Sequence, residues 1–461
     1  MAEWSKEIRE TLHLGVPMAG AQLSQILMNT TDVALVGRLS GDALAAMAVG
    51  QAAYGMLLSV GIGLVAAVGP MVSQAHGAGN NPAIARTVAV GVYVSFLVGL
   101  LFCLPLYFVD KLFLYLEYSP EMTQLATGYT RAVMLGLPFA FLFLVQKNYM
   151  DSISKPRLPM LIATVGVVVN AIADYAFMYG RLGFPTLGVT GTGLATTAVN
   201  LFMALVMLPL VWSPQLTAAV KATRARVWRE FFEVGLPIAG SIGIEVGLFV
   251  VGALMMGKLG SDEAAAHQIV LVCAAATFMV PLGISFAGST RVGQAVGRRD
   301  FAAVRPAGIS AIAVGSGFML FTATLFLLTP GTFVEIFWEP GIEKSAAVKT
   351  YAMQLLVIAG FFQIFDGMQV TAMGALRGIK DVKIPLVIGG LSYWVVGLGS
   401  ATYLTFYTEL RHRGLWLGFL FGLATAGIVL TLRFLALSSQ LVSDKELQRR
   451  VSVEAINEDM E

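Results

Sequence analysis

Long apolar runs occupy almost the whole chain, and they constrain its fold more than any other feature. Each run spans roughly 20 to 30 residues, and about 20 helical residues cross the hydrocarbon core of a bilayer. The chain is 57% hydrophobic and 13% charged, with a mean hydropathy of +0.76, outside the soluble range. We therefore expect twelve transmembrane helices, at about 14–37, 43–72, 84–109, 123–146, 158–180, 187–212, 234–257, 264–290, 306–330, 350–376, 384–408 and 414–436.

Several classes of protein do not fit this composition. Cys103 and Cys273 both lie inside apolar runs, so a disulfide framework is not expected. The N-terminal segment has mixed charge and no small-residue cleavage site before the first apolar run. We therefore interpret this first apolar run as a retained helix and not as a signal peptide. The net charge is only +2, and no run of Lys and Arg suggests a nucleic-acid partner.

Basic residues are distributed unevenly between the connections. With the N-terminus inside, 21 of the 30 Lys and Arg residues fall on the cytoplasmic side and 9 on the other side. Cytoplasmic connections of membrane proteins carry the excess of basic residues, so we expect both termini in the cytoplasm. The long basic connection 213–230 is interpreted as a cytoplasmic linker, and the charged segment 438–461 as a cytoplasmic tail.

The chain contains a tandem repeat. Residues 15–85 align with residues 235–305 at a constant offset of 220 and without a gap. The matches include Pro17 with Pro237 and Asp42 with Asp262. A high content of Gly and Ala in both halves could produce scattered matches of those two residue types, but it would not align Pro and Asp in the same ungapped register. Each repeat holds six spans, and an even number returns the chain to its starting side, so the two repeats share one orientation.

Parallel repeats of this kind are typical of transporters, which bind substrate between the two bundles and rock between two states. The sequence therefore predicts an all-α membrane protein with twelve transmembrane helices in two parallel-repeat six-helix lobes around a central cleft. The lobes are expected at 1–212 and 231–437, joined by the 213–230 linker.

Polar residues of the first lobe converge at one depth. Asp32 and Asp174 lie five and six residues before the expected outer ends of their spans, which places both carboxyl groups about 8 to 9 Å deep. Asn170 shares a helix face with Asp174, and Thr192 enters from the same side. Such a group fits a proton or hard-cation site. Hydrogen bonds that merely hold helices together are the alternative, but neutral side chains would serve that purpose at a lower desolvation cost.

The second lobe carries its own isolated acids. Glu245 and Asp366 are the charged residues toward the middle of their spans, where an acid costs on the order of 2.5–3.5 kcal/mol on insertion scales. A lone buried carboxyl group can bind a coupling ion or a cationic substrate in one state and release it in another. Gln363, one turn before Asp366, and Gln268 in span eight are expected either to line the cavity or to join helices.

These features resemble the multidrug and toxic-compound extrusion (MATE) family over roughly residues 10–437. The resemblance implies a cation-coupled antiporter in a bacterial inner membrane, with two six-helix lobes. The sequence resembles the NorM branch of this family in having carboxylates in both lobes, although NorM-like proteins often have a neutral residue in place of Asp174. The matching motifs are Pro17, Thr31-Asp32, Asn170 to Gly180, Gly188 to Gly193, Glu245, Asp366 and Arg377-Gly378.

The expected function is efflux of bulky organic cations by a monomer that uses no cofactor and is not an enzyme. The coupling ion is H⁺ or Na⁺, with a slight preference for H⁺ because Asp174 stands beside Asp32, and Na⁺ would use the same carboxylates of either lobe. A flippase for lipid-linked precursors, from the same superfamily, would need a basic cavity, whereas the buried charges here are acidic. An intramembrane lipid transferase would need clustered Asp or His residues at the interface, and the sequence has no such motif.

Overall fold

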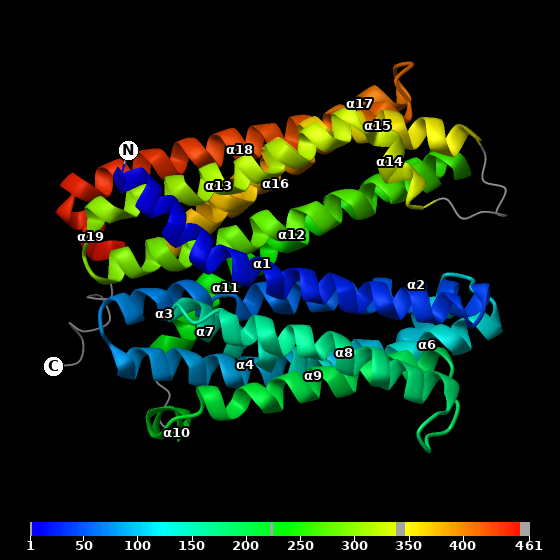
Figure 1. Cartoon of the computed structure of the whole chain (residues 1–461), viewed down its shortest axis with the longest axis horizontal. Helices are drawn as coiled ribbons and strands as arrows, with labels where there is room; N and C mark the ends of the chain where they lie inside the picture. The colour runs from blue at the N-terminus through cyan, green and yellow to red at the C-terminus, as the bar shows by residue number, and fades with distance from the viewer. Residues whose placement is uncertain (1, 222–224, 338–345, 452–461) are drawn as a thin grey trace. The chain divides into compact units, whose positions relative to one another are not determined.

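The computed structural model describes residues 2–221, 225–337 and 346–451, and every regular element in these ranges is a helix (Figure 1). Ten helical spans are long and apolar enough to cross a membrane, and α6 (Pro120–Met134) with α7 (Leu137–Ser152) forms a further, bent one. The ten are α2 (Gly41–Val65) with α3 (Val68–Gly77), α4 (Asn81–Tyr107), α8 (Arg157–Tyr179), α9 (Val189–Val211), α11 (Ala225–Leu259), α12 (Ser261–Gly297), α13 (Phe301–Leu328), α15 (Ala346–Gly378), the run of α16 (Lys383–Gly390), η1 (Leu391–Leu398) and α17 (Gly399–Phe406), and α18 (His412–Ser443).

The remaining predicted span corresponds to α1 (Ala2–Gly37), which at 36 residues is long enough to cross a bilayer. A helix therefore lies at each of the twelve predicted positions, and the all-α membrane fold is confirmed. Short helices fill several connections: α5 (Val109–Tyr115), α10 (Pro214–Lys221), α14 (Pro330–Glu335) and α19 (Lys445–Val451).

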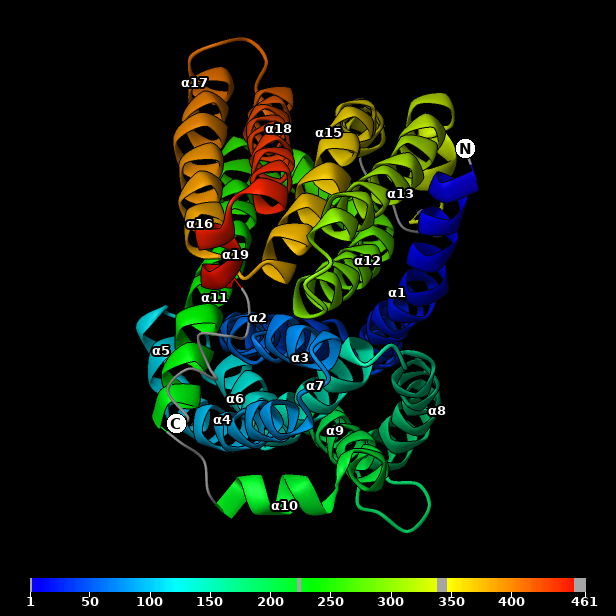
Figure 2. The same ribbon diagram turned by 90° about the vertical axis from the view of Figure 1, so that its left-hand side faces the viewer.

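The helices are longer and less regular than the apolar runs. α1 begins at Ala2 and α11 at Ala225, both ahead of the predicted spans, because a helix continues past the apolar stretch that hydropathy detects. α6 and α7 meet at a 43° bend. The eleventh span contains the π-helical segment η1, and this span packs beside α18 (Figure 2).

The internal repeat is visible in the helix bounds. α2 with α3 covers 41–77 and α12 covers 261–297, so both ends of the span recur at the offset found in the sequence. α4 begins at Asn81 and α13 at Phe301, which is the same offset again. Within this span the two repeats differ, because α12 is continuous where α2 and α3 are separated at Ala66 and Ala67.

The chain divides into two compact units, and the division cuts two helices at equivalent places. One unit contains Met1–Ala19, Gly77–Gly79 and Ser241–Glu461, and the other contains Gly20–His76 and Asn80–Gly240. The N-terminal part of α1 thus belongs to the unit that holds most of the second repeat. The N-terminal part of α11 belongs to the unit that holds most of the first repeat. The predicted boundary between lobes, in the 213–230 linker, stays a prediction.

The N-terminal parts of α1 and α11, each of which belongs to the unit of the other repeat, are called the exchanged segments below. Glycines permit these exchanged segments to pack closely. In one unit Gly283 of α12 lies against the backbone of Ala19, and in the other Gly63 of α2 lies against the backbone of Ala239. The two glycines are repeat counterparts of each other, and so are the two alanines. A Cβ atom at either glycine would overlap the neighbouring main chain, so the exchange depends on the same small-residue crossing in each repeat.

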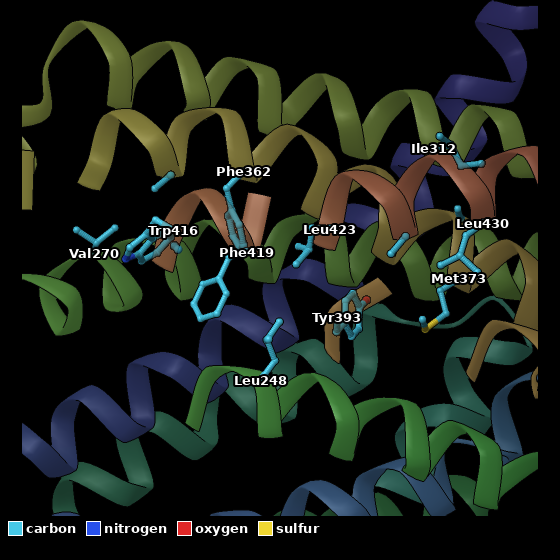
Figure 3. Packing of buried hydrophobic residues seen from close by; sticks show 14 of the residues in the cluster. Leu248, Val270, Ile312, Phe362, Met373, Tyr393, Trp416, Phe419, Leu423 and Leu430 are labelled. Atoms are coloured by element: carbon cyan, nitrogen blue, oxygen red, sulfur yellow. The ribbon is translucent and has the colours of Figure 1, made fainter. Parts of the chain in front are cut away.

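Apolar packing holds each unit together. In the unit of the second repeat, α12, α13 and α18 pack around α15 and enclose a large core (Figure 1). Buried aromatic side chains from two of its helices meet there, including Phe362, Trp416 and Phe419 (Figure 3). This core fixes the faces of α11 and α15 that carry the acids described below.

The exchanged part of α1 is fastened by an ion-pair network. Arg291 of α12, with only 9% of its side chain exposed, lies 2.6 Å from Glu7 and 2.7 Å from Glu10. It also donates to Thr11 Oγ1 at 2.6 Å and to Ser310 Oγ at 3.1 Å. The repeat counterparts of Arg291, Thr11 and Ser310 are buried apolar residues, namely Met71, Phe231 and Val90. Charge therefore contributes to holding the exchanged part of α1, at positions whose repeat counterparts are apolar.

We expect Arg291→Met to destabilise the protein by about 2 kcal/mol or more, because it leaves Glu7 partly buried without a cation. Thermal unfolding of the detergent-solubilised protein would measure the change. The same substitution together with Glu7→Gln should recover part of the loss. An unchanged unfolding temperature for Arg291→Met would show that the network contributes nothing.

Candidate functional site

The first group of predicted site residues comes together in the unit that contains Asp32. Asp32 lies on α1, and Asn170 and Asp174 lie on α8; all three are at most 5% exposed. Asp32 interacts electrostatically with both Asp174 and Asn170. Two contacts hold these helices side by side: Tyr179 Oη donates to Leu35 O at 3.2 Å, and the hydroxyl groups of Ser24 and Thr164 are 3.1 Å apart.

The polar atoms of this group are largely unsatisfied. Both carboxylate oxygens of Asp174, both polar atoms of the Asn170 amide and Oδ1 of Asp32 are buried without a hydrogen bond of acceptable geometry to any described residue. Such atoms are costly inside a protein unless another group binds them. Two adjacent carboxylates also repel each other unless a proton or cation lies with them. The arrangement therefore fits a proton or cation site better than a structural hydrogen-bond network.

Helix α9 supplies the hydroxyl groups. Thr196, which the sequence reasoning did not select, donates to Asp32 Oδ2 at 3.3 Å. Thr192, one turn earlier, is fully buried and its hydroxyl has no hydrogen-bond partner among the described residues. Gly191 and Gly193 let α9 approach its neighbours, since an added Cβ would lie 2.7 Å from the Phe177 carbonyl carbon and 2.7 Å from Tyr129 O, respectively.

The second pair of acids lies in the other unit, on α11 and α15. Phe249 follows Glu245 by four residues, and Phe362 precedes Asp366 by four, so each phenylalanine shares a helix face with its acid. The two rings meet edge to face with centroids 6.4 Å apart. Spans seven and ten cross the membrane in opposite directions, so both acids lie on the same side of this contact and at one level. Glu245 and Asp366 are electrostatic neighbours accordingly.

Two further residues join these acids. Arg377 of α15 interacts electrostatically with Glu245, and Tyr393 of η1 interacts with Glu245, Asp366 and Arg377. Arg377 belongs to the Arg377-Gly378 motif of the sequence analysis, whereas no sequence pattern singles out Tyr393. Trp394 Nε1 donates to Ile244 O at 3.1 Å, which ties η1 to α11 next to Glu245.

The two predicted glutamines have different surroundings. Gln363 is fully buried, and its Oε1 accepts a hydrogen bond from Thr322 of α13 at 2.7 Å. Its Nε2 is buried without a partner in the described part of the chain. Gln268 is exposed on α12, and no described contact joins it to Glu245 or Asp366. Gln363 thus joins α15 to α13 and keeps a hydrogen-bond donor that no described residue uses. Gln268 shows no such connection to the acids.

Chemically, each unit presents a pair of carboxyl groups that can exchange a proton or a small cation. Helices that span a membrane, a tandem six-span repeat and buried acids in both repeats define a multi-pass membrane transporter.

Comparison with known proteins identifies the family. The family model described as MatE matches residues 17–176 and again 237–403, and the starts of the two matches are separated by the offset of the internal repeat. The chain belongs to this family, multidrug and toxic-compound extrusion, as its motifs indicated, and it is a transporter and not an enzyme.

Curated relatives cover nearly the whole chain. A protein named "Probable multidrug resistance protein NorM" from Agrobacterium fabrum is 35% identical over 442 residues, which cover 94% of this chain and 95% of that protein. A protein of the same name from Bradyrhizobium diazoefficiens is 38% identical over 445 residues, with 95% of each chain covered.

Solved structures show the same fold at low identity. The eukaryotic MATE transporter AtDTX14 superposes with a TM-score of 0.86 at 19% identity, covering 97% of this chain and 99% of that one. A MOP superfamily transporter from Pyrococcus furiosus superposes with a TM-score of 0.87 at 20% identity, covering 95% and 97%. The prediction of twelve helices in two lobes is confirmed.

Proposed function

We propose that this chain is a multidrug efflux antiporter that exports bulky, partly apolar organic cations in exchange for a coupling cation. The observation that carries the proposal is the pair of acids in each unit, because adjacent acids inside a membrane helix bundle can bind a cation and release it as the protein changes state. The relatives' name, "Probable multidrug resistance protein NorM", supports the same function. We further propose a bacterial inner membrane as the location, with both termini in the cytoplasm.

Expression in a pump-deficient bacterial host should raise resistance to cationic dyes and fluoroquinolones, because an exporter lowers their concentration in the cell. The minimum inhibitory concentration across a panel of such compounds is the measurement. A transport-deficient variant expressed at the same level in the membrane serves as the control. Unchanged susceptibility across the whole panel, with the protein present in the membrane, would refute the proposal.

For the coupling ion we propose H⁺ in preference to Na⁺. The adjacent carboxyl groups of Asp32 and Asp174 can share a proton, and their common site is buried. Carboxylate, amide and hydroxyl oxygens are also ligands for Na⁺, so the distinction requires an experiment. Two separate assays should be made in proteoliposomes, one with a pH gradient alone and one with a sodium gradient alone. We expect the pH gradient to drive uptake of a fluorescent cation, and transport driven by sodium alone at constant pH would overturn the choice.

A flippase of lipid-linked precursors is the weaker alternative. Such a cargo carries pyrophosphate and needs basic groups, whereas acids outnumber the single arginine in the described group around Glu245. No observation favours the flippase over cation export.

A further inference from the structure

Four aromatic rings form a closed circuit in the unit of the second repeat, and we call them the aromatic quartet. They belong to Phe249 of α11, Phe362 of α15, and Trp416 and Phe419 of α18. Neighbouring rings have centroids 5.5 to 6.4 Å apart and meet edge to face at 62° to 78°. Each contact sets the positive edge of one ring against the negative face of another, so every ring is oriented by two neighbours. Figure 3 shows three of the four within the buried core.

A buried histidine orients one ring of the quartet. Trp416 Nε1 donates a hydrogen bond to Nδ1 of His267 on α12 at 3.1 Å, and both residues are at most 1% exposed. An indole N–H can only donate, so the imidazole accepts at Nδ1 and its proton lies on Nε2. The His267 ring also packs against that of Phe419, with centroids 6.5 Å apart. α12 is therefore tied to the quartet at both rings that α18 contributes.

Packing alone does not require a histidine at this position. His267 Nε2 is buried without a hydrogen-bond partner among the described residues, and a buried donor in that state is costly. The repeat counterpart is Met47, which is apolar and also 1% exposed. The scaffold that the two repeats share therefore accepts an apolar side chain here, and the histidine adds an acceptor for Trp416.

The quartet accompanies the acids of the second repeat. Glu245 and Phe249 stand where the first repeat has Gln25 and Asn29. The common scaffold therefore forms without either the acid or the ring. Since the two appear together, one turn apart on a single face of α11, we connect the ring with the acid and not with the fold.

The contact between Phe249 and Phe362 carries the order of the quartet to the acids. Phe249 lies one turn from Glu245, and Phe362 lies one turn from Asp366, each on the face of its acid. Their 6.4 Å contact thus fixes the spacing of α11 and α15 next to the level of the two carboxyl groups. Trp416 packs on Phe362 with centroids 5.5 Å apart, so the orientation of the indole acts on this spacing directly.

We propose that His267 is a positioning residue of the second pair of acids. By accepting the hydrogen bond of Trp416 it orders the aromatic quartet, and the quartet sets the separation of Glu245 and Asp366 at which an organic cation binds. This inference rests on the proposed function and adds a determinant of its cation affinity that touches neither the cation nor the acids.

The test measures two properties of each purified, full-length variant: its affinity for tetraphenylphosphonium and its unfolding temperature. His267→Met installs the residue of the counterpart position and removes the acceptor, and it should weaken binding by about fivefold. His267→Asn returns an acceptor, since its Oδ1 is as many bonds from Cα as the imidazole Nδ1. It should bind within about twofold of the unmodified protein.

A double variant and a control separate positioning from a purely structural role. His267→Met with Trp416→Phe removes both hydrogen-bonding partners, so the unfolding temperature should recover because no polar group of the pair stays buried and unpaired. The affinity should stay low, because the ring at 416 is no longer oriented. Phe326→Leu removes another buried edge-to-face pair of this unit, with Phe333 at 4.8 Å. It should lower the unfolding temperature and leave the affinity unchanged.

Rescue by His267→Asn, together with a double variant that regains stability but not affinity, supports the inference. If His267→Met does not fold, Trp416→Phe and the double variant carry the same comparison. An affinity that follows the unfolding temperature in every variant, or is unchanged in the folded His267→Met protein, overturns the inference and leaves the export function intact. If the folded, unmodified protein binds neither this cation nor any other organic cation, the proposed function fails and this inference fails with it.

Discussion

Replacing Glu245 with glutamine is expected to reduce transport to the level of empty vesicles while the protein remains folded. The amide keeps the shape of the side chain and removes only its ionisable charge, so binding of a cation at this lobe loses its strongest attraction. Glu245 makes no hydrogen bond to another described residue, and the loss of charge should therefore leave packing intact. Uptake of a fluorescent cation into proteoliposomes measures the effect.

Gln25→Glu is a matched control for this experiment, since Gln25 is the repeat counterpart of Glu245 in the other unit. Combined with Glu245→Gln, it restores the number of acids without restoring the site, and transport should stay absent. Glu245→Asp keeps the charge and should retain measurable transport. Normal transport by Glu245→Gln, at equal reconstitution, would remove this residue from the mechanism.

Replacing Gly283 with leucine is expected to prevent folding, with a cost of about 3 kcal/mol or more. The first atom of the new side chain would overlap the backbone of Ala19, and neither helix can move away without opening the core of the unit. Gly63→Leu should fail in the same way against Ala239. The yield of monodisperse protein in size-exclusion chromatography and its unfolding temperature are the measurements.

Gly317→Leu provides the control, because a Cβ at this exposed position of α13 meets no atom within 4 Å. It should leave the yield unchanged or slightly raise stability, since leucine favours a helix over glycine by up to about 1 kcal/mol. Normal folding of both Gly283→Leu and Gly63→Leu would show that the exchanged segments do not need close contact.

The fold could be predicted well from the sequence because a bilayer imposes a length of about 20 apolar residues on every span. The repeat could be predicted because Pro17 and Asp42 recur at one offset. The exchange of the first parts of α1 and α11 could not, because a continuous helix carries no mark of which bundle each half joins. The recurrence of Gly63 as Gly283 marks the close helix crossing on which the exchange depends, but many other glycines also match between the repeats.

The candidate site was predictable to the extent that charge in a membrane helix is rare. Asp32, Asp174, Glu245 and Asp366 were selected for that reason, and the structure pairs them as their depths suggested. Tyr393 carries no such signal, because its place near the acids depends on η1 lying against α11, a tertiary contact that no spacing in the sequence encodes. Arg377 directly follows the expected span 350–376, although its side chain reaches back along α15 to Met373.

The central claim is that each unit holds its own cation site, with Asp32 and Asp174 in one and Glu245 and Asp366 in the other. If the units move as bodies, each acid keeps its neighbours throughout the cycle. A double-mutant cycle of Asp32→Asn and Glu245→Gln, with the affinity for the coupling ion as its readout, tests this most directly. We predict that the two effects add, with an interaction energy below about 1 kcal/mol. A larger interaction energy would mean that the two acids serve one shared site and would contradict the account.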